Sequence, residues 1–132
     1  MLIFAIESTM ASWAQMPDER LQSQSQLIVY AQYLGDSVIE IDNKKFNLGI
    51  LNVSKVLKGQ ISSAFVFIKT PAPSQGLRSD MIFFKSGQSG LWFLKPVSNL
   101  KGIYHISHPS QFQQTTPSGD IVKYWQQRLL NP

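Results

Sequence analysis

Histidine is the first residue type in this sequence that could do chemistry, because imidazole is the most common metal ligand in proteins. The chain has two histidines, His105 and His108, and Pro109 follows directly. Side chains three positions apart on a strand point to opposite faces, and proline ends such an element. Two ligands rarely form a metal site by themselves, and no acidic residue lies nearby in the sequence. We therefore expect a surface or half-buried pair, and no metal.

Two serine patterns are similar to catalytic motifs but lack the context those motifs need. Ser89 lies in the run Gly-Gln-Ser-Gly-Leu, one residue short of a G-x-S-x-G elbow, which requires a strand followed by a helix. A strand is expected to follow here, so the run predicts a tight turn. Ser98 and Lys101 fit S-x-x-K, which works when the two lie one helical turn apart. Pro96 and Gly102 bracket them, which favours a loop and a chance match.

Glu40 and Asp42 are the carboxylates whose spacing suits acid–base work, since alternate residues on a strand lie roughly 7 Å apart on one face. Lys44 and Lys45 follow them in a polar, turn-like segment. Solvated charges are the usual occupants of such a turn, so a surface position is predicted. The sequence therefore predicts no catalytic residue, no cofactor and no metal site, and an enzyme of unrecognised type is the least favoured class.

The aromatic and basic residues raise a different hypothesis, single-stranded nucleic-acid binding, in which bases stack on exposed rings within a basic groove. The candidate platforms are Tyr30, Tyr33 and Trp92, and the strand-associated lysines are Lys55, Lys69, Lys85 and Lys95. The competing interpretation is that these rings fill a core and the gap beneath terminal helices. We favour the core because the twelve Lys and Arg are scattered and the net charge is only +4.

Length and composition limit the remaining classes. The chain has 132 residues, 43% of them hydrophobic and 15% charged, which fits one globular domain with its own core. It has no cysteine, which excludes disulfides, thiolate nucleophiles and cysteine-based zinc sites. No stretch is long and apolar enough to span a membrane as a helix.

Many short strands separated by turns are expected along the chain. Helix signals mark residues 17–22 and 120–130; in the second, Ile121, Trp125 and Leu129 repeat every four residues, and Ser118 could cap it. β-Branched and aromatic runs mark strands at 27–41, 46–57, 64–68, 91–94 and 103–106. The apolar parity shifts within the second strand, which predicts a β-bulge near Gly49. A bent first strand and a bulged second one favour a mostly β fold: an OB-like closed or partly open five- to six-stranded barrel with a short N-terminal helix and a C-terminal helix.

The first residues are expected to stand apart from this domain. Residues 1–16 read as a truncated signal peptide or a frayed N-terminus, and residues 17–132 as a single OB-like domain. The apolar start and the small residues Ser12 and Ala14 suggest cleavage before Gln15, although a basic leading region is missing. This favours a periplasmic or secreted location, with the cytoplasm as the alternative.

Two strand-and-turn motifs resemble the netrin-module/TIMP-like OB-fold domains of bacterial exported proteins. One is residues 53–59, V-S-K-V-L-K-G, and the other is residues 87–94, G-Q-S-G-L-W-F-L. The matching positions are Val53, Val56, Lys58, Gly59, Gly87, Leu91 and Phe93. The resemblance implies structural roles for them. In the animal relatives an N-terminal cysteine chelates the zinc of a metalloproteinase, and a chain without cysteine cannot use that mechanism.

The leading hypothesis is therefore a non-enzymatic exported module that binds an unknown protein or cell-envelope component. The alternative is a cytoplasmic OB-fold protein that binds single-stranded nucleic acid. Within the fold, Gly59 is expected to have a positive φ. Leu91 and Phe93 are expected to point together into the barrel, with Trp92 on the other face.

Overall fold

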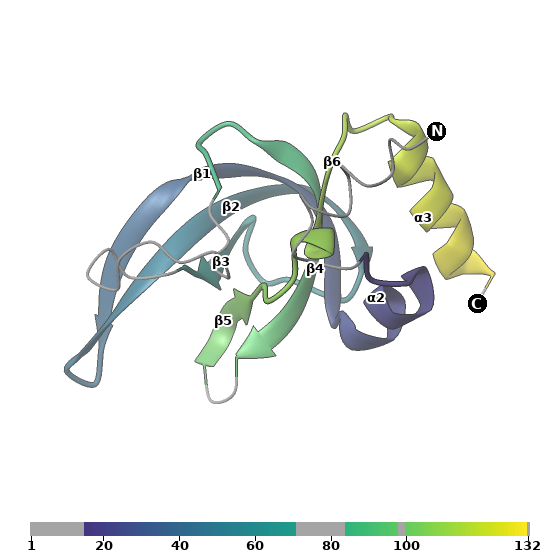
Figure 1. Ribbon diagram of the computed structural model, residues 1–132. Coiled ribbons are helices and arrows are strands. Elements are labelled where there is room, and N and C mark those ends of the chain that lie inside the picture. Colours follow the sequence, from purple (N-terminus) through teal and green to yellow (C-terminus); the bar gives the residue numbers. More distant parts are fainter. Residues whose placement is uncertain (1–14, 71–83, 98–99, 132) are drawn as a thin grey trace, which may run out of the picture.

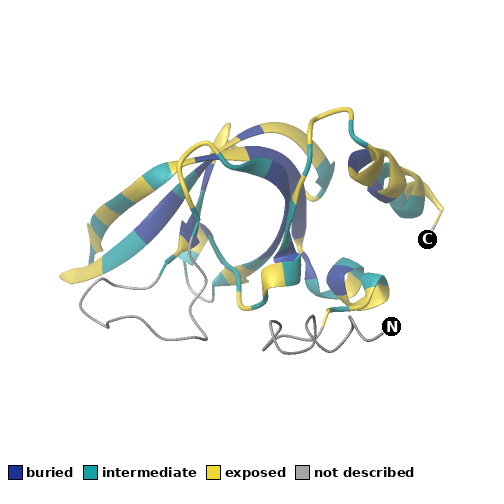
Figure 2. Cartoon of the chain, turned by 45° about the horizontal axis from the view of Figure 1, so that its top comes forward, coloured by how far each residue is buried: buried dark blue, intermediate teal, exposed yellow. Residues whose placement is uncertain are grey.

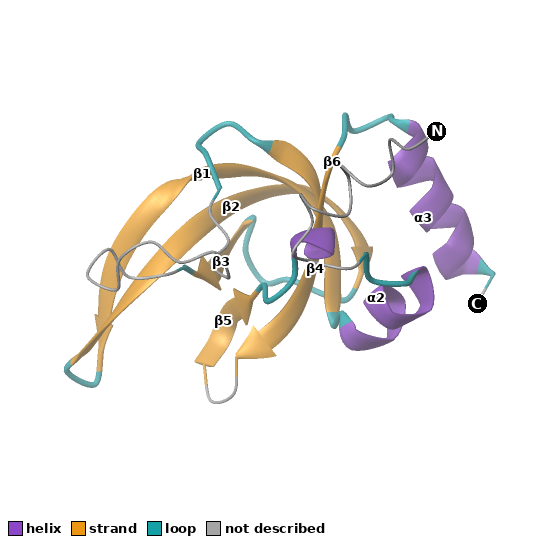
Figure 3. Ribbon diagram, viewed as in Figure 1, coloured by secondary structure: helices purple, strands orange, loops and turns teal. Residues whose placement is uncertain are grey.

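The computed structural model describes residues 15–70, 84–97 and 100–131, and strands dominate it (Figure 1, Figure 3). In chain order the elements are α2 (Asp18–Gln24), β1 (Leu27–Ile41), β2 (Lys44–Lys58), β3 (Phe65–Lys69), β4 (Ser89–Val97), β5 (Leu100–His105), the 3-10 turn η2 (Pro109–Gln111), β6 (Phe112–Gln114) and α3 (Asp120–Leu130).

Five strands follow one another in a ring, in the order β1-β2-β3-β5-β4, and β4 pairs again with β1. The β3–β5 contact is parallel and consists of Phe67 opposite Ile103 and Ile68 opposite Tyr104. β6 pairs with residues 90–92 of β4, the residues that pair with β1 along the other edge. Because β3 and β5 pair over so short a length, the ring is barrel-like but not closed. The expected OB-like barrel with two flanking helices is confirmed in its partly open form.

β1 and β2 form one long, bent hairpin that extends beyond the barrel (Figure 1). Asp42 and Asn43 make its turn with φ of 51° and 65°, a left-handed conformation that these residues tolerate. A register irregularity lies beside Gly49, as predicted, but its extra residue is Leu34 of β1, between Tyr33 and Gly35, rather than a residue of β2. Gly49 instead makes room for the ring of Tyr33, with which a side chain at position 49 would collide.

An inner core cluster fills the barrel. Alternate residues of β1 and β4 point into it, since successive side chains of a strand face opposite sides. Trp92 is fully buried there, and its ring contacts those of Tyr33, Phe84 and Phe112 with centroids 6.1, 4.8 and 4.3 Å away. The buried members of the inner cluster are Leu27, Val29, Ala31, Tyr33, Leu51, Val53, Val66, Ile68, Trp92 and Leu94. Figure 2 shows the buried stretches of the curved strands as a dark band.

A second core cluster lies on the outer face of β1 and β4, beneath the two helices (Figure 1). The other alternate residues of the same strands supply it, so β1 and β4 are covered on both faces. Its buried members are Leu21, Ile28, Tyr30, Leu91, Phe93, Val122 and Trp125.

The C-terminal helix has the expected bounds, but its buried stripe is shifted. Trp125 is 1% exposed and Leu129 packs against the outer cluster, as predicted. Ile121 is 37% exposed and Val122 takes the expected place at 1%. The reason is the helical period: Val122, Trp125 and Leu129 follow the spacing i, i+3, i+7 that keeps one face toward the core, whereas a repeat of four drifts around the helix.

The helix ends also differ from the sequence-based expectation. α2 covers Asp18–Gln24 rather than residues 17–22, with Pro17 as its N-cap and two acidic residues in its first turn. The N-cap of α3 is Gly119, and no side chain caps that helix. The predicted cap by Ser118 is therefore wrong.

The faces of β4 are the reverse of those predicted. Leu91 and Phe93 do share a face, but that face is the outer cluster beneath α2 and α3. Trp92 points into the barrel with Leu94. The sequence pattern could not separate the two faces because residues 91–94 are all apolar, and both faces prove to be buried.

The motif 53–59 fixes where β2 ends. Val53 belongs to the inner cluster, whereas Val56 is 39% exposed. Lys58 donates a hydrogen bond from Nζ to the carbonyl of Gln22 at 2.6 Å and so anchors the last turn of α2. Gly59 has the predicted positive φ, 92°, and a Cβ there would lie 2.6 Å from the carbonyl oxygen of Gln26.

Candidate functional site

A groove of about 580 Å³ opens between β6 and the helices, and we call it the polar groove. Its volume falls within the range of small-molecule sites. Its lining residues are Gln15, Asp18, Ser110, Gln113, Gln114, Asp120, Ile121, Tyr124 and Trp125. Amides, a hydroxyl and two carboxylates therefore stand beside partly exposed apolar side chains.

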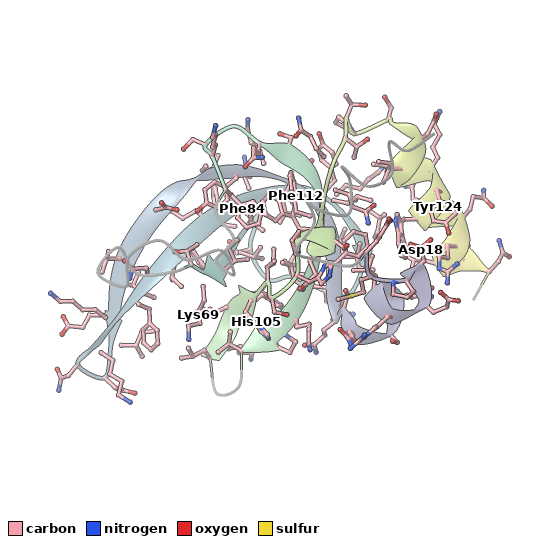
Figure 4. The ribbon with its side chains drawn as sticks, in the orientation of Figure 1. Asp18, Lys69, Phe84, His105, Phe112 and Tyr124 are labelled. Carbon is pink, nitrogen blue, oxygen red and sulfur yellow. The ribbon has the colours of Figure 1, made fainter. Side chains whose placement is uncertain are left out.

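The helix side of the polar groove is held by a contact between α2 and α3. The hydroxyl of Tyr124 donates a hydrogen bond to the Asp18 carboxylate at 2.5 Å (Figure 4). That bond raises the pKa of Tyr124, because the carboxylate favours the protonated phenol. Asp120 lies in the first turn of α3, where the helix dipole favours a negative charge. The groove thus presents two carboxylates on neighbouring elements.

The strand side of the polar groove depends on a buried amide that the sequence analysis did not single out. Gln111 is 3% exposed, and its Nε2 donates to the carbonyl of Phe93 at 2.9 Å. Its Oε1 accepts from the backbone N–H groups of Ser107 and His108 at 2.8 and 2.9 Å. These bonds fix η2 against β4, and η2 leads directly into β6. No sequence motif marks Gln111, and its burial is visible only in the structure.

Gly90 allows β6 to lie close to β4. A side chain at position 90 of β4 would collide with the carbonyl of Gln113 in the neighbouring strand β6. The turn motif 87–94 therefore includes one glycine whose role is close approach of two strands rather than a turn. Gly87, by contrast, has φ of 95° and open space around it, as a turn glycine should.

A second candidate surface, which we call the cationic row, crosses the outer face of three strands. His105 of β5 lies opposite Lys95 of β4, and Lys69 of β3 follows the pair Ile68–Tyr104 and so lies beside His105 (Figure 4). Burial lowers the pKa of His105 from its ordinary value of 6.5, and the charges of Lys95 and Lys69 lower it further. Three groups that can be cationic therefore stand together.

Two strands of the cationic row, β3 and β5, together with the segment before β3, also border a hollow of about 460 Å³. Phe65 is 46% exposed there and Lys101 lies at its edge, with Tyr104 and Ile61 as further apolar lining. An exposed ring near lysines is the combination that base stacking needs.

The aromatic platforms chosen from the sequence do not lie on this surface. Tyr30, Tyr33 and Trp92 are 6%, 1% and 0% exposed, so they are core rings, as the competing interpretation held. Of the lysines proposed with them, Lys69 and Lys95 belong to the cationic row. Phe65 was missed because it is one of several apolar residues in a run whose two faces look alike in sequence.

The remaining catalytic candidates lie apart. Glu40 and Asp42 are exposed at the hairpin tip, and Ser89 opens β4 after a turn, with no helix following. Ser98 lies outside the described residues, while Lys101 is on a strand. His108 accepts a hydrogen bond from the N–H of Ser110 at 3.0 Å through Nδ1 and caps η2, whereas His105 belongs to β5.

Within residues 15–70, 84–97 and 100–131, no three His, Asp or Glu side chains gather where they could hold a metal ion. The helices in this part of the chain are all too short or too polar to cross a membrane.

The fold is thus an OB-like, partly open barrel that carries two candidate binding surfaces. No model of a known protein family matches the chain, and no curated protein matches it. The resemblance to netrin-module/TIMP-like domains stays a hypothesis that rests on the two motifs.

Proposed function

We propose that this chain is a non-enzymatic binding module of an exported protein, and that the polar groove is where it binds a protein or cell-envelope partner. The observation that carries the proposal is the groove itself: an open, concave surface lined by residues of the end strand β6 and by the two carboxylates Asp18 and Asp120. Concave surfaces with a few convergent polar groups are where binding sites usually lie.

The N-terminal sequence supports the exported location. Cleavage before Gln15 is the site that the small residues suggest, and Gln15 lines the polar groove. Met16 packs against the outer cluster, and its N–H donates to Ser110 Oγ at 3.2 Å. Removal of a signal peptide would therefore create a new N-terminus at the edge of the proposed binding surface.

Site-specific photo-crosslinking in the source cells tests this proposal. A photoreactive phenylalanine at Gln114, in the polar groove, should form a discrete crosslink to an envelope or secreted protein. The same group at Lys123, an exposed residue of α3 that does not line the groove, is the matched control. Equal crosslinking at both positions, or recovery of the protein from the cytoplasm alone, would contradict the proposal.

A second candidate function is single-stranded nucleic-acid binding, and the cationic row is the observation that favours it. Lys69, His105 and Lys95 could follow a phosphate backbone while the exposed ring of Phe65 stacks on a base. This would be a cytoplasmic activity. It keeps Lys69 and Lys95 from the sequence-based hypothesis but replaces the buried rings with the exposed ring of Phe65.

Binding of a fluorescent oligothymidylate measures this activity. Neutralising one phosphate contact lowers the salt dependence by about one counterion, so Lys69→Gln and Lys95→Gln should each flatten the salt slope by about 0.7. Affinity should also rise as the pH falls below 6.5, because His105 has a lowered pKa and takes up a proton only there. Lys123→Gln is the control, and binding that is insensitive to Lys69, Lys95 and Phe65 would argue against this function.

A further inference from the structure

β6 leaves one of its edges without a strand partner among the described residues. It stands at the end of the strand order and pairs with β4 through Gly90–Gln114, Leu91–Gln113 and Trp92–Phe112. Gln113 and Gln114 both line the polar groove, so β6 borders it. An unpaired strand edge offers a row of backbone donors and acceptors to another extended chain.

The hydrogen-bonding pattern between β4 and β6 shows which backbone groups of β6 point away from β4. The N–H of Thr115 donates to the carbonyl of Ser89 at 3.3 Å, which makes that a hydrogen-bonded pair. In an antiparallel ladder such pairs alternate, so Gln113 bonds to β4 while the N–H and C=O of Gln114 point to the opposite side. The N–H of Phe112 donates to the carbonyl of Pro109, so only the carbonyl of Phe112 is available to a strand added at the free edge.

The charge and apolar character of the polar groove define what could pair there. Asp18 and Asp120 are its two charged lining residues, and the described lining includes no lysine or arginine. The opposite wall presents Ile121 and Tyr124, which are 37% and 47% exposed. An added strand would therefore meet acidic groups and partly apolar side chains across the width of the groove.

We propose that the polar groove binds an extended segment of a partner protein, which adds to β6 as a further strand and places lysine or arginine side chains against Asp18 and Asp120. This inference rests on the proposed binding function and names its partner chemistry. Backbone pairing with Gln114 would supply register and affinity, and the two carboxylates would select basic segments.

A short blocked peptide of alternating lysine and threonine, titrated into the full chain, tests the inference. Two matched peptides separate the contributions: one with glutamate in place of lysine, and one N-methylated at alternate amides so that it cannot pair. The expected result is binding of the first peptide alone, with chemical-shift changes at Gln113, Gln114 and Thr115 and new exchange protection of the Gln114 amide.

Two protein variants make the test specific to the strand edge. Gln114→Pro removes the outward N–H but no bond to β4, and proline is tolerated on that side of an edge strand. This variant should bind the lysine peptide at least about tenfold more weakly, a loss of about 1.4 kcal/mol in binding free energy. Gln114→Thr is the control that keeps the N–H, and it should bind nearly as well as the native chain. Asp18→Asn with Asp120→Asn should weaken binding several-fold, since exposed ion pairs contribute modestly.

Each other outcome overturns the inference in a distinguishable way. Equal binding of the N-methylated peptide, or no effect of Gln114→Pro, would refute strand addition but leave the groove as a binding site. Preference for the glutamate peptide would refute the basic partner. Self-association abolished by Gln114→Pro would make the occupant a second copy, and a crosslink from Gln114 to residues 1–14 would make it this chain itself. The absence of any peptide effect together with no partner crosslink at Gln114 would remove the proposed function as well.

Discussion

Replacement of Trp92 by alanine is expected to lower the free energy of unfolding by about 3–5 kcal/mol, the usual cost of emptying a core aromatic site. Trp92 is fully buried in the inner cluster, where its ring packs on Phe112 and Phe84. Its Nε1 also donates to the carbonyl of Ala31 at 2.8 Å, and that buried hydrogen bond would be lost. Such a loss is comparable to the whole stability of a small domain.

Denaturant unfolding followed by circular dichroism measures the change, and Trp92→Phe provides the matched control. Phenylalanine keeps most of the ring volume but not the N–H, so it should cost clearly less than alanine. If Trp92→Ala unfolds at the same denaturant concentration as the native chain, the barrel interior is not packed around this ring.

The barrel was predictable from the sequence because most of its strands carry their own signal. β-Branched and aromatic runs separated by turn residues mark most strands, and Gly59 marks the end of β2. The helix at Asp120–Leu130 was found for the same reason, since its apolar residues recur at helical spacing. Local sequence patterns therefore predict where most strands and the C-terminal helix lie.

The faces of β4 and the stripe of α3 were not predictable, because both depend on what packs against them. Residues 91–94 are apolar throughout, so only the presence of helices on one side and a ring of strands on the other decides where Trp92 points. Ile121 and Val122 are adjacent, and the way α3 packs on the outer cluster buries Val122 and leaves Ile121 partly exposed. Alternation of polar and apolar residues identifies the buried face of a strand only when the other face is polar, and residues 91–94 of β4 have no polar face.

The polar groove was not predictable either, because its parts are distant in sequence and individually common. Asp18 and Tyr124 are separated by 106 residues, and nothing in either segment indicates the other. β6 has only three residues, too few for a strand pattern. The cationic row is similar: Lys69, Lys95 and His105 gather only because β5 inserts between β3 and β4.

Replacement of Trp125 by alanine is expected to release α3 from the barrel and to lower the free energy of unfolding by about 3–5 kcal/mol. Trp125 is 1% exposed, and its ring meets that of Phe93 edge-on with centroids 4.8 Å apart. α3 has 11 residues, and a helix of that length is marginal without packing. The outer cluster would therefore open on its helix side while the inner cluster stays filled.

Hydrogen exchange followed by NMR separates this effect from a general loss of stability. In Trp125→Ala the amides of α3 should lose most of their protection, whereas those paired between β1 and β2 should lose it only as far as global unfolding requires. Tyr124→Ala is the control: the residue is 47% exposed, so its removal should lower the free energy of unfolding much less than removal of Trp125, although it breaks the bond to Asp18.

The contact between Trp125 and Phe93 can be measured directly in a double-mutant cycle. Phe93→Ala combined with Trp125→Ala should be less destabilising than the sum of the two, by the roughly 0.5–1.5 kcal/mol of an aromatic pair and more where both empty one cluster. If α3 keeps native exchange protection in Trp125→Ala, the helix is held mainly by its polar contacts. Those are the Tyr124 bond to Asp18 and the bond from Arg128 Nε to Gln22 Oε1 at 2.9 Å. Because α3 also forms one wall of the polar groove, the expected release of the helix should abolish peptide binding there as well.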